Sequence, residues 1–127
     1  MTALVNRSLP VRAVHRSGDG VFPDGVEVVA ADCTDLEAAR EACTGAAVVY
    51  NCLNVPYEQW ADQLPVLTEH SIAAASHADA PLIMTDNLYM YGPTDGPMTE
   101  ETPRTPQGTK GALRAELETM LRNAHEQ

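Results

Sequence analysis

The chain has 127 residues, 44% of them hydrophobic, and a formal net charge of −10 at pH 7. This length suits one domain and is enough to bury a core. Its eight Lys and Arg residues are scattered, which argues against nucleic acid and anionic membranes as partners. The sequence also lacks an apolar run of the roughly 18 residues that a membrane span needs, and its N-terminus lacks the apolar segment of a secretion signal.

Two short strands are expected in the first third of the chain. Val11–His15 contains β-branched residues and is followed by a loop with two glycines at residues 17–20. Val26–Ala30 has the same character and follows the turn at residues 23–25. Each segment has the length and composition of a strand rather than of a helix.

A helix and a third strand are expected next. Either Thr34 or Asp35 can cap a helix that runs to about Cys43, and Gly45 ends it. Residues 46–53 are almost continuously apolar, which is typical of a strand covered by helices on both faces.

The second half of the chain continues this alternation. A helical pattern runs from about residue 57 to 77, although Pro65 should kink it or begin a new helix. Residues 81–85 form the next buried strand, and a loop rich in Gly, Pro and Thr covers residues 91–107. The last helix begins near Lys110 and has an apolar face. Strands that alternate with helices predict an α/β domain with a mostly parallel sheet in layers.

Four segments resemble consecutive strands of the extended or atypical short-chain dehydrogenases/reductases, the NAD-dependent epimerase/dehydratase family. Residues 11–17, 26–35, 47–52 and 82–93 resemble its second, third, fourth and fifth strands with their exits, the last ending in Tyr-Gly-Pro. The resemblance implies a Rossmann-type fold in which a parallel sheet forms the middle of three layers.

The glycine turn of this family has no counterpart in the chain. Family members hold the cofactor's pyrophosphate on a Gly-x-x-Gly-x-x-Gly turn at the start of the first helix. Here residues 3–10 resemble the end of that helix. We therefore expect residues 1–127 to be a partial NAD(P)-binding domain without its first βα unit, truncated at the N-terminus and also at the C-terminus.

The family's catalytic pattern is incomplete in this sequence. Its Tyr-x-x-x-Lys pair transfers a proton through the Tyr, whose pKa the Lys lowers, while a Ser or Thr orients the substrate. Lys110 fits the Lys position, but Pro106 stands at the Tyr position and Asn87 at the Ser/Thr position. Tyr89 or Tyr91 could supply a phenol, so we take Lys110, Asn87 and Tyr91 as the candidate catalytic residues.

Five residues are candidates for cofactor binding by the same resemblance. Arg16, at the second strand's end, favours NADP over NAD by its charge, or it is a solvated arginine. Asp32 matches the acidic residue beside the adenine, or it caps a turn. Leu53 and Asn54 would lie beside the cofactor, although an asparagine there is often a turn residue. Lys110 would contact the nicotinamide ribose, or it is a surface lysine at the start of a helix.

The sequence offers no metal site. His70 and His77 share a helix face without a third ligand, so solvated histidines are expected. Cys33, Cys43 and Cys52 lie among apolar residues at spacings that match no metal pattern. Buried, reduced cysteines and the lack of a secretion signal predict a cytoplasmic protein.

The leading functional hypothesis is an NAD(P)-dependent epimerase, dehydratase or reductase that acts on a small carbonyl or sugar-type substrate. The alternative is a non-catalytic, atypical family member that binds nucleotides or regulates another protein, which the replacements at positions 87 and 106 favour. Because the first strand of this fold lies at the centre of the sheet, its absence would leave strand edges unpaired. We therefore expect a homo-oligomer or a complex with a complementing chain.

Overall fold

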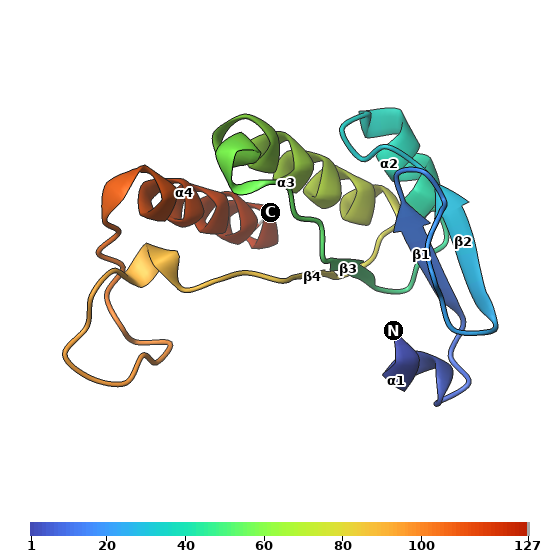
Figure 1. The fold of residues 1–127 in the computed structure, drawn as a ribbon, viewed down its shortest axis with the longest axis horizontal. Helices are drawn as coiled ribbons and strands as arrows, with labels where there is room; N and C mark the ends of the chain where they lie inside the picture. Colours follow the sequence, from blue (N-terminus) through green and yellow to red (C-terminus); the bar gives the residue numbers. More distant parts are fainter. Residues whose placement is uncertain (127) are drawn as a thin grey trace.

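The computed structural model describes residues 1–126. Strands and helices alternate along the chain after a short N-terminal helix (Figure 1). The elements are α1 (Thr2–Val5), β1 (Val11–His15), β2 (Val26–Ala30), α2 (Leu36–Cys43), β3 (Val49–Asn51), the 3-10 helix η1 (Tyr57–Gln59), α3 (Trp60–His77), β4 (Leu82–Met84), the 3-10 helix η2 (Tyr89–Tyr91) and α4 (Gly108–His125).

The strands form two separate parallel pairs. β1 pairs with β2 from Val11 opposite Val26 to His15 opposite Ala30. β3 pairs with β4 over three residues in each strand. In Figure 1, β1 lies between β2 and β3, but β1 and β3 are not hydrogen-bonded to each other in the described residues. Parallel pairing is confirmed, and the sheet is divided at the position where the expected first strand would lie.

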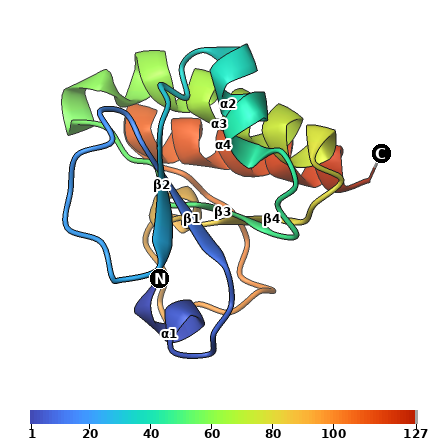
Figure 2. The same cartoon turned by 90° about the vertical axis from the view of Figure 1, so that its right-hand side faces the viewer.

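Helices α2, α3 and α4 lie along one face of the strands, and the short α1 lies toward the other side (Figures 1 and 2). Apolar side chains on the uncovered face remain in solvent: Val28 is 40% exposed, Tyr50 54% and Ile83 47%. The prediction that residues 46–53 and 81–85 are buried on both faces is therefore wrong. The third and fourth strands are also shorter than predicted, with three residues each.

Helix α2 begins and ends where the sequence predicts. Asp35 is the N-cap, and its Oδ1 accepts a hydrogen bond of 2.9 Å from the backbone N–H of Ala38. The chain leaves the helix through Thr44 and Gly45, and Gly45 has a φ of 74°, which a residue with a side chain rarely adopts. The capping side chain is therefore that of Asp35 rather than that of Thr34.

Asp35→Ala is expected to lower the free energy of unfolding by about 1 kcal/mol, since the Ala38 N–H loses its acceptor. Asp35→Asn is the matched control, because asparagine caps helices about as well as aspartate does. Urea unfolding followed by circular dichroism would measure both. Equal stability of the Ala and Asn variants would contradict a capping role.

Helix α3 runs from Trp60 to His77 with Pro65 inside it, so the predicted new helix start at Pro65 is wrong, and the alternative of a kink stays a prediction. Proline removes one backbone hydrogen bond and crowds the preceding turn. Leu64 and Leu67, on either side of Pro65, are 3% and 4% exposed. The burial of these two leucines stabilises the helix and outweighs the unfavourable helix propensity of proline.

The main apolar cluster lies between α3 and α4. It contains Trp60, Leu64 and Leu117, all buried, with Val55, Leu113 and Met120 packed against it. Leu117 is 1% exposed, and it comes from the face of the last helix that the sequence predicts to be apolar. None of the helices in residues 1–126 combines the length and apolarity that crossing a membrane requires.

Candidate functional site

Most of the predicted site residues follow the carboxyl ends of strands. Arg16 comes after β1, Asp32 after β2, Leu53 and Asn54 after β3, and Asn87 after β4. In open parallel α/β folds, ligands bind beyond these ends. The exits of the four strands are therefore the region in which a site is expected.

Arg16 and Asp32 form an ion pair, with Arg16 Nε 3.4 Å from Asp32 Oδ2. Asp32 Oδ1 also accepts hydrogen bonds from the backbone N–H of Thr34, at 3.0 Å, and from its hydroxyl, at 2.8 Å. These two bonds, and then the charge of Arg16, hold the pKa of Asp32 below its usual value. In this structure Asp32 organises its own turn and balances the charge of Arg16.

A buried asparagine shapes the exit of β3. Asn51 Oδ1 accepts a 2.8 Å hydrogen bond from the backbone N–H of Leu53, and its Nδ2 donates to Ser71 Oγ at 2.8 Å. Leu53 and Asn54 are themselves exposed. Asn51 and Ser71 were not predicted as site residues, because they are far apart in sequence and no motif links them.

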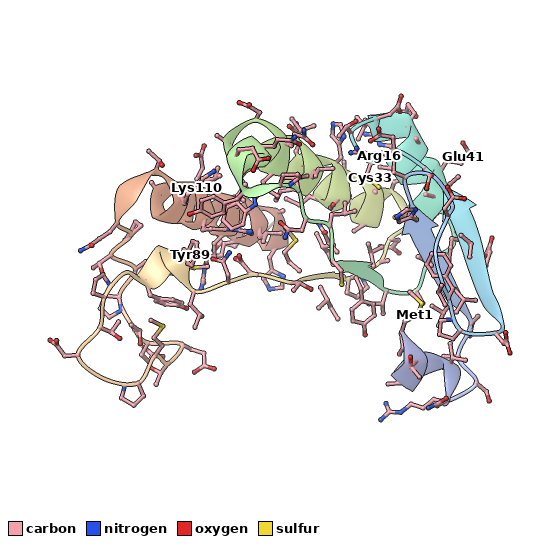
Figure 3. The ribbon with its side chains drawn as sticks, viewed as in Figure 1. Met1, Arg16, Cys33, Glu41, Tyr89 and Lys110 are labelled. Atoms are coloured by element: carbon pink, nitrogen blue, oxygen red, sulfur yellow. The ribbon has the colours of Figure 1, made fainter. Side chains whose placement is uncertain are left out.

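A hollow of about 420 Å³ lies where the loop after β4 meets the start of α4. Figure 3 shows Lys110 and Tyr89 near this end of the molecule and Arg16 near the opposite end. Mainly apolar groups and a single ammonium line the hollow: its residues are Tyr57, Leu88, Tyr89, Gly92, Met98, Gln107, Lys110 and Gly111.

Aromatic rings and a carbonyl hold Lys110 in place. Its Nζ lies 4.5 Å from the ring centroid of Tyr57 and 5.5 Å from that of Trp60, and it donates a hydrogen bond to the backbone carbonyl of Tyr57. An ammonium over an aromatic face is stabilised by the ring's quadrupole. It carries three N–H donors, so it can serve a ligand as well as the carbonyl.

The structure brings Tyr89, rather than Tyr91, to the hollow that contains Lys110. Within the described residues, Tyr91 is not part of its lining. The pKa of Arg122, at the far end of α4, is raised mainly by Glu118 and to a smaller degree by the Tyr91 phenol. Tyr89 therefore shares the hollow with Lys110, whereas the role of Tyr91 as the catalytic phenol stays a prediction.

Gly111 lets η2 approach the start of α4 closely. A Cβ atom at position 111 would lie 2.9 Å from the backbone oxygen of Tyr89 and 3.3 Å from the Cβ of Pro106. The glycine thus brings Tyr89 close to the first turn of the helix that carries Lys110. Pro106, four residues before Lys110, also lies against Gly111.

Asn87 stabilises the loop and is not part of the lining of the hollow in the described residues. Its Oδ1 accepts a 3.1 Å hydrogen bond from the backbone N–H of Tyr89, and its own N–H donates to Asp86 Oδ1 at 2.7 Å. Asp86 also pairs with Arg114, at 3.1 Å. Sequence reasoning missed this pair, because Arg114 and Asp86 lie far apart in the sequence and no motif links them.

The cysteines and histidines offer no metal centre. In residues 1–126, no three His, Cys, Asp or Glu side chains are grouped so that they could hold a metal ion. His70 Nδ1 lies 2.9 Å from the backbone oxygen of Cys33. Burial raises the pKa of the Cys33 and Cys43 thiols, which are partly buried. Cys52 is exposed, so the expectation that all three are buried is wrong for this residue.

The chain matches no family model and no curated protein, but it is similar to solved structures. A candidate epimerase from Burkholderia cenocepacia J2315 aligns with 98% of the chain at 20% identity and a TM-score of 0.79. MoeE5 in complex with UDP-glucose and NAD aligns with 97% at 21% identity and a TM-score of 0.77. A short-chain dehydrogenase/reductase superfamily protein from Agrobacterium tumefaciens with bound NAD aligns with 95% at 20% identity and a TM-score of 0.69.

These alignments use a limited part of the solved structures. The chain covers 45% of the first, 43% of the second and 39% of the third. Almost all of the chain nevertheless superposes, with the order of strands and helices that the sequence predicts. The chain therefore has the Rossmann-type fold of the epimerases and short-chain dehydrogenases/reductases, over less than half the length of these proteins.

Proposed function

We propose that this chain is part of an NAD(P)-dependent epimerase, dehydratase or reductase that acts on a small carbonyl or sugar-type substrate. The observation that carries the proposal is the placement of Lys110 over the rings of Tyr57 and Trp60, in a hollow that Tyr89 shares. NAD in two of the similar structures, and UDP-glucose in one of them, support this ligand class.

Lys110 would bind the nicotinamide ribose and favour the ionised form of a nearby phenol, since a positive charge stabilises a phenolate. With Pro106 in place of the usual tyrosine, we assign the phenol to Tyr89, which donates a proton to the substrate oxygen or accepts one from it. Asn87 keeps Tyr89 in position through the hydrogen bond to its N–H. The cofactor, when bound, supplies or accepts the hydride.

A titration with NADPH and with NADH tests this proposal. Trp60 is the chain's single tryptophan and lies beside Lys110, so a ligand in the hollow should change its fluorescence. Because the glycine turn is lacking, we expect affinities that are micromolar or weaker. Lys110→Met should weaken binding by about tenfold, the effect of one charge-assisted hydrogen bond.

Arg7→Met, which removes one positive charge near α1, is the matched control and should leave the affinity unchanged. Submicromolar affinity would contradict the expected loss of the pyrophosphate site. Equal NADPH affinity of the wild type and Lys110→Met would contradict the proposal that the cofactor binds in the hollow beside Lys110.

We also propose that NADP is preferred over NAD, through Arg16. A 2′-phosphate must compete with Asp32 for the guanidinium. Asp32→Asn is therefore expected to raise the ratio of NADPH to NADH affinity, and Arg16→Asp to lower it by about tenfold or more, because bonds to charged groups contribute about 1.5–3 kcal/mol. Calorimetry would measure both ratios, with Arg7→Asp as the control for net charge. If the ratio of NADPH to NADH affinity is the same in all of these variants, the 2′-phosphate does not bind at Arg16.

A non-catalytic module is the second candidate, and Pro106 favours it because the residue at the family's proton-transfer position cannot transfer one. Turnover assays with NADPH and small carbonyl compounds separate the two candidates. Nucleotide binding without hydride transfer would support the module. Hydride transfer that is lost in Tyr89→Phe would support the enzyme.

For partners, we propose a homo-oligomer or a complex with a complementing chain. The support is the uncovered apolar strand face together with the facing edges of β1 and β3, to which no strand is hydrogen-bonded in the described residues. Exposed edges and apolar faces favour association with other chains.

A further inference from the structure

Arg114 is a buried arginine in the middle of the contact between α3 and α4. Its side chain is 8% exposed, and its guanidinium carbon lies 4.3 Å from the ring centroid of Trp60. Its Nη1 lies 3.1 Å from Asp86 Oδ1. Its Nε is buried and has no hydrogen-bond partner in the described residues.

A continuous set of contacts leads from Arg114 to the hollow. The oxygen of Asp86 that accepts from Arg114 also accepts from the backbone N–H of Asn87, at 2.7 Å. Asn87 Oδ1 then accepts from the backbone N–H of Tyr89, at 3.1 Å. Three hydrogen bonds thus connect the guanidinium of Arg114 with Tyr89, which lines the hollow.

Stability alone is a poor explanation for an arginine at this position. Removing a charge from water is costly, and apolar residues of similar volume often replace buried ion pairs without loss of stability. Here the cost is increased by the Nε that lacks a partner. A methionine at position 114 could fill the same space against Trp60, but it could not bind Asp86.

We propose that Arg114 is a positioning residue for the ligand site: through Asp86 and Asn87 it fixes the loop that carries Tyr89. The guanidinium is itself held against Trp60, so the loop after β4 is fixed to the apolar cluster between α3 and α4. The inference rests on the proposed function in taking the hollow beside Lys110 as the ligand site.

Hydrogen–deuterium exchange on the full chain tests this role without any ligand. In the double variant Arg114→Met/Asp86→Ala, the amides of residues 87–91 should exchange about tenfold faster, because the Asn87 N–H loses its acceptor and the loop is no longer held to α4. Amides of residues 67–75, inside α3, should exchange as in the wild type. The melting temperature should be unchanged or higher.

Arg114→Lys is the conservative variant. It should retain part of the protection of the loop amides that the double variant loses, because it keeps a positive charge near Asp86. A purely structural role makes a different prediction: the double variant would melt at a lower temperature, and exchange would rise in α3 as much as in the loop. That result would overturn the proposal, as would unchanged exchange in residues 87–91. Failure of NADPH to bind the wild type would count against the proposed function alone, since the exchange measurement uses no nucleotide.

Discussion

Leu117→Ala is expected to lower the free energy of unfolding by about 2–5 kcal/mol, the range for truncating a leucine in a packed core. Leu117 is 1% exposed and lies in the cluster with Trp60 and Leu64. Truncation leaves a cavity between α3 and α4, where Leu117 packs against Trp60 and Leu64. Domains of this size are stable by only about 5–15 kcal/mol, so the loss is a large fraction of the total.

Urea unfolding followed by the fluorescence of Trp60 would measure this loss, since the indole belongs to the same cluster. Leu9→Ala is the matched control, because the same side chain is truncated at a position that is 49% exposed. We expect the control to change stability by less than about 0.5 kcal/mol. Similar losses in both variants would show that the contact between α3 and α4 is looser than the structure indicates.

The double variant Tyr50→Lys/Ile83→Lys is expected to reduce self-association strongly. Both side chains are about half exposed on the strand face that lacks helices. They are opposite each other in the pairing of β3 with β4, so the two lysines would place like charges at the centre of this apolar surface. Charged residues on exposed strands are a common protection against unwanted pairing.

Sedimentation at several protein concentrations would measure the effect as a fall in average mass relative to wild type. Leu9→Lys/Val21→Lys makes the same change in net charge at exposed positions outside the strands, and it should leave the mass distribution unchanged. If the wild-type chain stayed monomeric at every concentration, the expectation of self-association would be wrong. If the control variant lowered the mass as much, net charge would be the cause.

The sequence patterns located most elements because their signals are local. Asp35 and Gly45 mark the ends of α2, and β-branched runs mark β1 and β2. Coverage of the strands could not be predicted in this way. An apolar run indicates that a strand can be buried on both faces, but helices from elsewhere must supply the cover, and for residues 46–53 they do so on one side.

The location of a candidate site residue was predictable where it depends only on the position of the residue after a strand. Arg16 and Asp32 follow strands, and their location beyond the strand ends follows from the alternation of elements. Which of the two tyrosines lines the hollow was not predictable, because the sequence does not indicate the 3-10 helix that sets the directions of their side chains. The pairing of Asp86 with Arg114 joins residues 28 positions apart, and no spacing rule applies to such a pair.

The divided sheet has a consequence for how the chain unfolds. The part with β1, β2 and α2 meets the part with β3, β4, α3 and α4 mainly where α2 packs against α3, close to the bond between His70 and Cys33. Without a shared strand ladder, each part can open as a separate cooperative unit. Fluorescence of Trp60 follows the second part, whereas circular dichroism follows both. The two transition curves should therefore not coincide, and the β1–β2–α2 part should be the first to become accessible to proteases.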